Sequence, residues 1–308
     1  MKRIVRKTYR LKNFFRDDIW TIDLEEISKA KARFIKYTKV MLLTIKTFAN
    51  ERIGFQAVAL SFFSTMSVVP FIAIMFAITG GLGLADKLKE LLYAYFQNSQ
   101  QTIDTVLGFS QNIIDTAQSS AMGLVSALMF GFIVIWMMLN VERVFNNVWR
   151  VRKARNIVKR LSYILAMIIL SPFVVMIFFA GSVVYSHALE FIGIDPESLG
   201  VFRSILAWLL FATVATLTFS AMYKFIPNAA VRYSSALRAA IPAAIAFTII
   251  QYLYLETQVF VTRLNTIFGT FAAVPLFMVW INIGWFIILS GAELSYAFQN
   301  VDNYNLED

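Results

Sequence analysis

The sequence predicts an all-α, polytopic membrane protein with six transmembrane helices, a cytoplasmic amphipathic N-terminal helix and an external helical cap between spans one and two. Hydrophobic residues make up 58% of the 308 residues and charged residues 15%, with a mean hydropathy of +0.65. Soluble domains average about 25% charged residues. A third observation is the placement of the 28 Lys and Arg residues between the apolar stretches.

Six stretches are long and apolar enough, at about 20 residues each, to cross a hydrocarbon core of about 30 Å as helices. They lie at 55–80, 120–141, 161–186, 203–223, 236–259 and 271–294. The expected division is cytoplasmic basic helices over 1–54, the transmembrane domain over 55–299 and a cytoplasmic tail over 300–308. The opening segment lacks the apolar core of a signal peptide, so we expect no cleavage upstream of residue 50.

The Lys and Arg residues are concentrated in every second segment between the apolar stretches. Residues 1–54, 142–160 and 224–238 hold 24 of the 28 Lys and Arg residues, whereas the alternate segments hold four, namely Lys87, Lys89, Arg203 and Arg263. Because cytoplasmic loops retain Lys and Arg, both termini are expected in the cytoplasm. The predicted topology is therefore multi-pass, with both termini on the cytoplasmic side.

A basic amphipathic helix is predicted before the first span. Apolar side chains recur at helical spacing, and Lys residues occupy the opposite face. The apolar set is Leu24, Ile27, Phe34, Met41, Ile45 and Phe48, and the basic set is Lys29, Lys36, Lys39 and Lys46. The pattern favours a helix on the inner membrane surface, and a helix packed against the bundle is the alternative.

The long segment 81–119 between spans one and two is predicted to form the external cap. Leu84, Leu88, Leu91, Leu92 and Tyr95 lie at helical spacing, and a similar but looser pattern follows. Two short amphipathic helices are expected, because a structureless connection of this length is unusual in a compact domain.

Composition also limits the chemistry. The chain has no Cys and one His, which excludes Cys-ligated zinc, iron–sulfur clusters, thiol nucleophiles and structural disulfides. No metal, cofactor or catalytic residue is assigned, and the sequence favours a protein that is not an enzyme.

Polar residues near the cytoplasmic ends of the spans are the candidate binding site. Glu293 is costly inside a membrane and should face a partner or a wet cavity. Its candidate partners are Arg143, Lys224 and Arg238, and Asn140 belongs to the same level, whereas Asn265 belongs to an outer polar cluster. A structural ion pair and a substrate or proton site are both open interpretations of Glu293.

Four stretches resemble one bacterial family. QAVALSFFSTMSVVPF, LNVERVFNNVWRV, YKFIPNAAVRYSSALRAAIPAA and LNTIFGTFAAVPLFMVWINIGWFIILSGAEL are similar to the YihY/virulence-factor BrkB-like inner-membrane proteins over about residues 45–299. The resemblance implies six helices with cytoplasmic termini. It marks Pro70, Asn140, Pro227, Asn228, Pro242, Asn265, Gly269, Pro275, Trp280, Gly291, Ala292 and Glu293. Members have carried the label ribonuclease BN, and others are associated with serum resistance or envelope lipid handling.

Three functions remain open at this stage. The basic clusters favour a transporter or flippase-like protein for a lipid or other anionic amphiphile, with anionic membrane lipids as partners. A non-transporting envelope scaffold is the alternative, and a ribonuclease is remote, with no nucleic acid expected as a partner. Small-residue stripes such as Gly123, Ala127 and Gly131 fit packing within one bundle or a homo-oligomer.

Overall fold

The computed structural model describes residues 19–22, 27–50, 53–95, 100–119, 121–153, 155–191, 201–268 and 273–303. These residues form helices joined by short connections, and no strand occurs among them. Six helices are long and apolar enough to cross a membrane, which confirms the predicted fold class. They are α4 (Ile53–Gly81), α7 (Ala121–Val148), α8 (Ile157–Phe191), α9 (Val201–Phe225), α10 (Tyr233–Phe268) and α11 (Ala273–Asn300).

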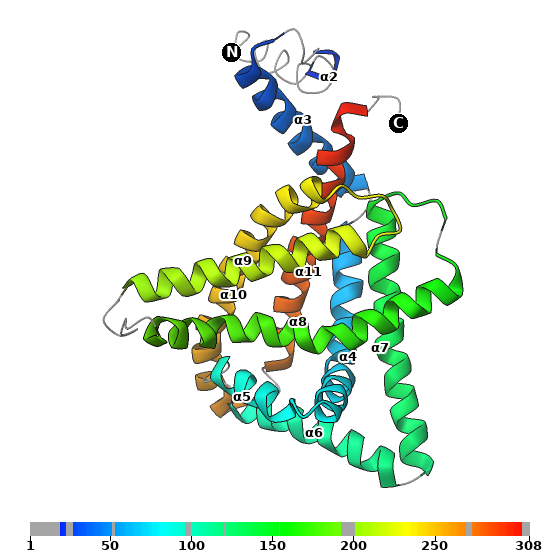
Figure 1. Cartoon of the computed structure of the whole chain (residues 1–308), viewed down its shortest axis with the longest axis vertical. Coiled ribbons are helices and arrows are strands. Elements are labelled where there is room, and N and C mark those ends of the chain that lie inside the picture. The colour runs from blue at the N-terminus through cyan, green and yellow to red at the C-terminus, as the bar shows by residue number, and fades with distance from the viewer. Residues whose placement is uncertain are drawn as a thin grey trace.

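Shorter helices stand at both ends of this set. Before the first span come α2 (Ile19–Thr21) and α3 (Lys29–Asn50), and the 3-10 helix η4 (Val301–Asn303) follows α11. The predicted cap segment forms α5 (Ala85–Tyr95) and α6 (Gln100–Ser119). Gly83, at φ +70°, turns the chain between α4 and α5, a left-handed conformation that favours glycine after a helix. In Figure 1, α3 and the end of α11 lie at one end of the molecule and α5 and α6 at the other.

The later spans pack in the order of the chain, and the last span also packs against the first. α10 packs along both α9 and α11, and α11 also packs against α4, which contacts α7. α8 runs across α4 and α7 in the view of Figure 1, and α9 packs against α8. α11 also contacts α7 and α9, so it packs against four of the other five spans and forms the centre of the bundle.

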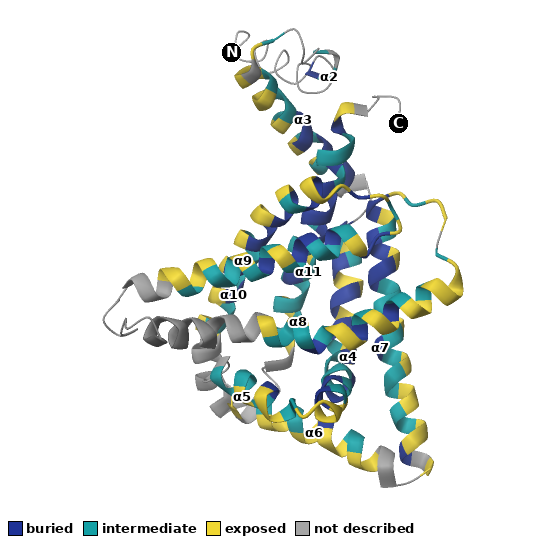
Figure 2. Ribbon diagram, viewed as in Figure 1, coloured by how far each residue is buried: buried dark blue, intermediate teal, exposed yellow. Residues whose placement is uncertain are grey.

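The largest group of buried side chains lies toward the end that carries α3. It combines the start of α4, the ends of α7, α9 and α11, and the start of α10. Figure 2 shows the buried residues gathered there, whereas the lower part of α7 is mostly exposed or half-buried. Smaller clusters lie elsewhere, around Val134 and Ile164 and around Phe76 and Leu88.

Two predicted small-residue stripes differ in their packing. Ala236, Ala240 and Ala244 on α10 are fully buried, so this stripe permits close helix approach. On α7, by contrast, a Cβ added at Gly131 would meet no atom within 4 Å. The middle of α7 instead presents large apolar side chains outward, as expected for a surface that contacts lipid.

One face of α3 packs against the bundle and the opposite face is exposed. Val40 and Leu43 are buried against Ala297 and Val301 at the end of α11. Lys36 and Lys39, predicted on an exposed basic face, instead turn toward the protein: Lys36 pairs with Asp302 at 2.6 Å, and Lys39 donates to the Ile22 carbonyl at 3.2 Å. Phe34, Met41 and Ile45 remain exposed on the opposite side.

Candidate functional site

The three basic segments of the chain meet at one end of the molecule, which we call the basic end. It comprises residues 140–160, 224–238 and 293–303 together with α3, and it lies at the top of Figure 1. The contacts below join these segments, which are distant in sequence. The charge pattern therefore has a direct structural counterpart, because the segments predicted to share a membrane side do share one end.

A buried carboxylate organises this end. Glu142, near the end of α7, is 1% exposed. Arg155 Nη1 lies 3.3 Å from its Oε1, and Arg160 Nε lies 2.7 Å from its Oε2. Arg155 also stacks on Tyr163, with 4.4 Å from Cζ to the ring centroid. Because the buried charge has two cationic partners, the desolvation that disfavours a lone carboxylate is offset.

Arg155 also completes the end of α9. Its guanidinium donates to three consecutive carbonyls at 3.0–3.2 Å, those of Phe225, Ile226 and Pro227. The last carbonyls of a helix have no partner within the helix, and arginine carries five N–H donors in a planar fork. One side chain from the α7–α8 connection thereby fixes where α9 ends.

Amide side chains add further ties across the basic end. The Asn228 backbone N–H donates to Asn146 Oδ1 at 2.7 Å, and its side-chain amide donates to the Lys153 carbonyl at 3.0 Å. The Arg232 backbone N–H donates to Gln299 Oε1 at 2.7 Å. The connection between α9 and α10 is thus held by α7 on one side and by α11 on the other.

The backbone turns sharply where α7 ends. Arg150 has φ of 50°, a left-handed conformation uncommon outside glycine. Its guanidinium lies 5.2 Å from the centroid of the Tyr296 ring on α11, and Trp149 packs edge-on against the same ring at 5.6 Å. These aromatic contacts hold the turn against the end of α11.

Asn140 and Arg143 lie together on α7, as predicted. Arg143 Nη1 is 3.5 Å from Asn140 Oδ1, and the Asn140 amide donates to the Trp136 carbonyl at 2.8 Å. Arg143 is exposed, so its charge is presented outward from the helix.

Glu293 is fully buried near the end of α11. Successive residues of an α-helix are about 100° apart, so Glu293 lies about 200° around the helix from Gly291. Gly291 faces α9 and α10, because a Cβ there would come within 2.8 Å of Tyr223 and Ala243 atoms. Glu293 therefore faces the other side of α11.

That other side is occupied by α4 and α7. Trp285 on α11 donates to Ser64 of α4 at 2.8 Å, and Tyr296 contacts Trp149 at the end of α7. Both residues lie within about 80° of Glu293 around the helix. The Glu293 carboxylate is thus positioned among the ends of α11, α4 and α7.

Lys224 and Arg238 come from the opposite side of α11. The Lys224 ammonium donates to the Val231 carbonyl, across the connection between α9 and α10. Arg238 donates to the Ser234 carbonyl at 3.2 Å and lies 5.8 Å from the centroid of the Phe298 ring. The structure brings both to the basic end but not to the face that carries Glu293. The side chain of Asn265, in α10, lies outside the described residues.

The sequence of this chain is similar to that of a known protein family. The family model described as virulence factor BrkB matches residues 44–308. The chain belongs to this family. The match includes all six transmembrane helices of the BrkB-family chain and the whole basic end except the first part of α3.

Relatives of the BrkB-family chain carry membrane-protein names. A UPF0761 membrane protein of Janthinobacterium sp. is 29% identical over 80% of this chain and 57% of the relative. Another, from Chromohalobacter salexigens, is 29% identical over 78% of this chain and 58% of the relative. The chain spans less than two thirds of the length of these relatives. No solved structure matches it.

Segments 140–160 and 224–238 at the basic end of this BrkB-family chain hold seven exposed cations. Within the described part of the chain, none of them is in an ion pair. They are Arg143, Arg150, Arg152, Lys153, Lys159, Arg232 and Arg238. Their charge faces outward, and arginines suit carboxylate or phosphate groups because they can bind them in a bidentate way.

Sequence reasoning missed the residues that hold this end together. Arg155 and Arg160 carry the contacts with Glu142, yet in sequence they look like the other cations of the same connection. Nothing in the sequence around Asn146 and Gln299 predicts their hydrogen bonds either. The available signal was Glu142 itself, since a carboxylate next to a span predicts a nearby cation without saying which. In the described residues, no group of three or more His, Cys, Asp or Glu could hold a metal ion.

Proposed function

We propose that the protein binds an anionic amphiphile, a lipid or a lipid-like molecule, at its basic end and moves it across the membrane. The observation that carries the proposal is the group of exposed cations at a well-packed end. Basic groups beside transmembrane helices attract anionic headgroups, each contributing about 1 kcal/mol. The membrane location of the spans would supply the acyl chains of such a ligand with an apolar surface.

The packing at the basic end supports a fixed binding surface. The Glu142 carboxylate forms ion pairs with Arg155 and Arg160. We therefore assign these three side chains to the scaffold and not to ligand binding. The exposed cations are mounted on this scaffold. Positions held by hydrogen bonds and packing need less ordering when a headgroup binds, which strengthens binding.

Glu293 has a separate part in the proposal. A carboxyl buried among the ends of three spans can take up or release a proton as the helices move, which would couple ligand movement to a proton. A Glu293→Gln variant keeps the size and one carbonyl oxygen, replaces the other oxygen by an NH2 group, and cannot ionise. If the carboxyl carries this coupling, the variant will bind lipid normally and fail to move it.

The experiment uses purified protein in phosphatidylcholine liposomes with a trace of fluorescent phosphatidylglycerol. Dithionite added outside destroys only the probe in the outer leaflet. If the protein moves lipid, the protected inner fraction will decay in protein-containing liposomes. An Arg143→Gln, Arg152→Gln, Lys153→Gln variant should slow this decay by about tenfold to 100-fold, because it removes up to about 3 kcal/mol of attraction.

Lys87→Gln is the matched control, since it removes an exposed cation from the other end of the molecule. Its decay should equal that of the unaltered protein. Decay no faster than in empty liposomes would overturn lipid movement. If, in addition, the lipids that stay bound to the protein during purification in a mild detergent had the same composition as the bulk membrane, the scaffold alternative would replace the proposal.

A further inference from the structure

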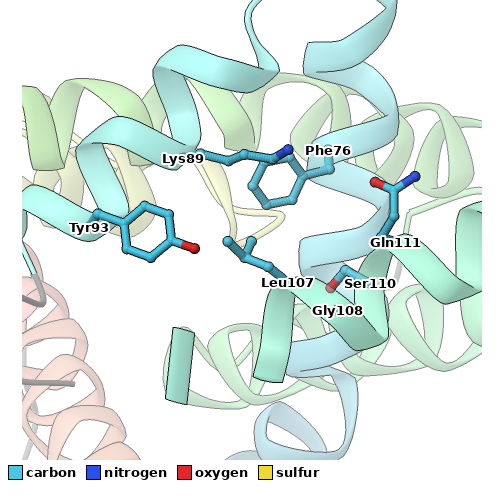
Figure 3. A pocket seen from close by; sticks show the side chains of 7 residues that line it. All are labelled: Phe76, Lys89, Tyr93, Leu107, Gly108, Ser110 and Gln111. Atoms are coloured by element: carbon cyan, nitrogen blue, oxygen red, sulfur yellow. The ribbon is translucent and has the colours of Figure 1, made fainter. Parts of the chain in front are cut away.

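A cavity of about 240 Å³ lies between α4, α5 and α6, far from the basic end. Figure 3 shows the side chains around it, which come from all three helices. They are Phe76 from α4, Lys89 and Tyr93 from α5, and Leu107, Gly108, Ser110 and Gln111 from α6.

The neutral polar groups of the lining are already engaged. Tyr93 donates to Asp104, Gln111 donates to Asp115 at 2.8 Å, and the Ser110 hydroxyl donates to a carbonyl one turn back on α6. The hydrogen bond from Tyr93 to the Asp104 carboxylate raises the pKa of the phenol. Tyr93 therefore stays neutral at physiological pH, and the carboxylates of both Asp residues already accept bonds from the lining.

Lys89 is different, because it is the one charged residue among the seven that line the cavity. Its ammonium lies 6.0 Å from the centroid of the Phe76 ring, so the charge is held over the apolar wall. In the described residues it takes part in no ion pair. Among the described lining residues the ammonium is thus the one charged group, and the nearby carboxylates of Asp104 and Asp115 are hydrogen-bonded to Tyr93 and Gln111. An ammonium carries three N–H donors that a ligand can accept.

We propose that this cavity binds an anionic group of phosphate size, with Lys89 as its cationic partner and Phe76 and Leu107 against the adjoining carbon atoms. The site goes beyond the proposed function. It lies at the other end of the molecule, and it would bind its ligand whether or not lipid crosses the membrane.

The volume supports a small ligand group. Sites for drug-sized ligands enclose about 300–1,000 Å³, and this cavity, at about 240 Å³, is smaller. It suits a headgroup or a small phosphate ester rather than a whole lipid. The apolar wall beside the cation favours a group attached to carbon over a fully hydrated ion.

Two variants test the site in different ways. Lys89→Gln removes the charge and nearly preserves the length of the side chain. Gly108→Leu fills the space and keeps the charge. A Cβ at Gly108 would meet no atom within 4 Å, so the new side chain has room, and leucine is a better helix former than glycine. Lys87→Gln is the control, because Lys87 is exposed on α5 and does not line the cavity.

The probe is dodecyl phosphate, titrated calorimetrically into the purified full chain in dodecyl maltoside micelles. Saturable binding should weaken by about tenfold or more in Lys89→Gln, as expected for loss of a charged hydrogen bond. Gly108→Leu should weaken it at least as much, and Lys87→Gln should not change it. Circular dichroism and elution volume should be the same for all four proteins.

Equal weakening in Lys87→Gln and Lys89→Gln would overturn the site, because it would mean unspecific attraction to the micelle surface. Unchanged binding in Gly108→Leu would overturn it as well. A second arm adds inorganic phosphate or glycerol phosphate as competitor. Competition would assign the site to a water-soluble phosphate, and its absence to the headgroup of an amphiphile, both within the proposed class. Failure of lipid movement at the basic end leaves this result unaffected.

Discussion

At the scale of single residues, Gly291 is where α11 comes closest to α9 and α10. A Cβ there would lie 2.1 Å from the Tyr223 hydroxyl oxygen and 2.8 Å from the Ala243 Cβ. We predict that Gly291→Ala destabilises the protein by about 1–3 kcal/mol, the usual effect of overpacking a core. Thermal unfolding of the purified protein in detergent measures the change.

Two further variants make this prediction specific. Tyr223→Phe removes the nearest atom, and in the described residues its hydroxyl has no hydrogen-bond partner, so the double variant should recover part of the loss. Gly131→Ala, where space is open, should leave stability unchanged or raise it by up to about 1 kcal/mol. Equal effects at positions 131 and 291 would contradict the close approach.

Glu142 supports a second prediction at this scale. Glu142→Gln leaves Arg155 and Arg160 without their counter-charge, so stability should fall by about 3 kcal/mol, toward the lower end for a broken buried pair because both arginines are partly exposed. Lys36→Gln breaks the exposed pair with Asp302 and should cost less than about 1 kcal/mol. Denaturant titration in detergent compares the two. Equal losses would show that burial does not strengthen the Glu142 network.

The residue scale is also where prediction from sequence was weakest. Glu293 is conspicuous in the sequence because a carboxylate in an apolar span is rare, and Glu142 directly follows a predicted span. The cations that pair with Glu142 cannot be picked out from the sequence, because the direction in which a cationic side chain turns depends on tertiary packing. Arg155 turns inward onto the end of α9, whereas Arg152, three residues earlier, is exposed, and nothing in the local pattern separates them.

At the scale of elements, α3 is apolar on two opposed faces. Val40 and Leu43 pack against α11, while Phe34, Met41 and Ile45 are 74%, 56% and 62% exposed. We predict that the outer face lies in the headgroup layer of the membrane. The chain has no Cys, so a nitroxide can be attached at Met41→Cys or Lys31→Cys without competing thiols.

In anionic liposomes the label at position 41 should collide mainly with oxygen dissolved in lipid, and the label at exposed position 31 mainly with a water-soluble nickel complex. Paramagnetic relaxation distinguishes the two. If both labels reported water, α3 would project from the membrane and its outer face would be free to contact a protein.

Elements were predicted more securely than residues. The lengths of the apolar stretches gave all six spans, because a membrane requires about 20 apolar residues whatever their neighbours. The ends were less well predicted, since α8 begins at Ile157 rather than 161 and includes polar residues beyond the apolar stretch. The division of α3 between two partners could not be foreseen, because a helical pattern does not say which apolar face meets protein.

At the scale of the whole molecule, the distribution of charge predicts the orientation in the membrane. The basic end should face the cytoplasm and α5 and α6 the outside. Single-Cys variants at Arg152 and Lys87 test this in intact cells with a thiol reagent that cannot cross the membrane. Position 87 should react and position 152 only after the cells are opened. The reverse result would invert the topology.

The unequal packing of the two ends has a mechanical consequence. Five spans share their largest buried cluster at the basic end, where side chains also tie the connections together. Rigid helices joined in this way can turn with least disruption about the joined end, which acts as the fulcrum. Any rearrangement of the spans would then be amplified along their length, so small adjustments at the basic end would produce larger displacements at the opposite ends.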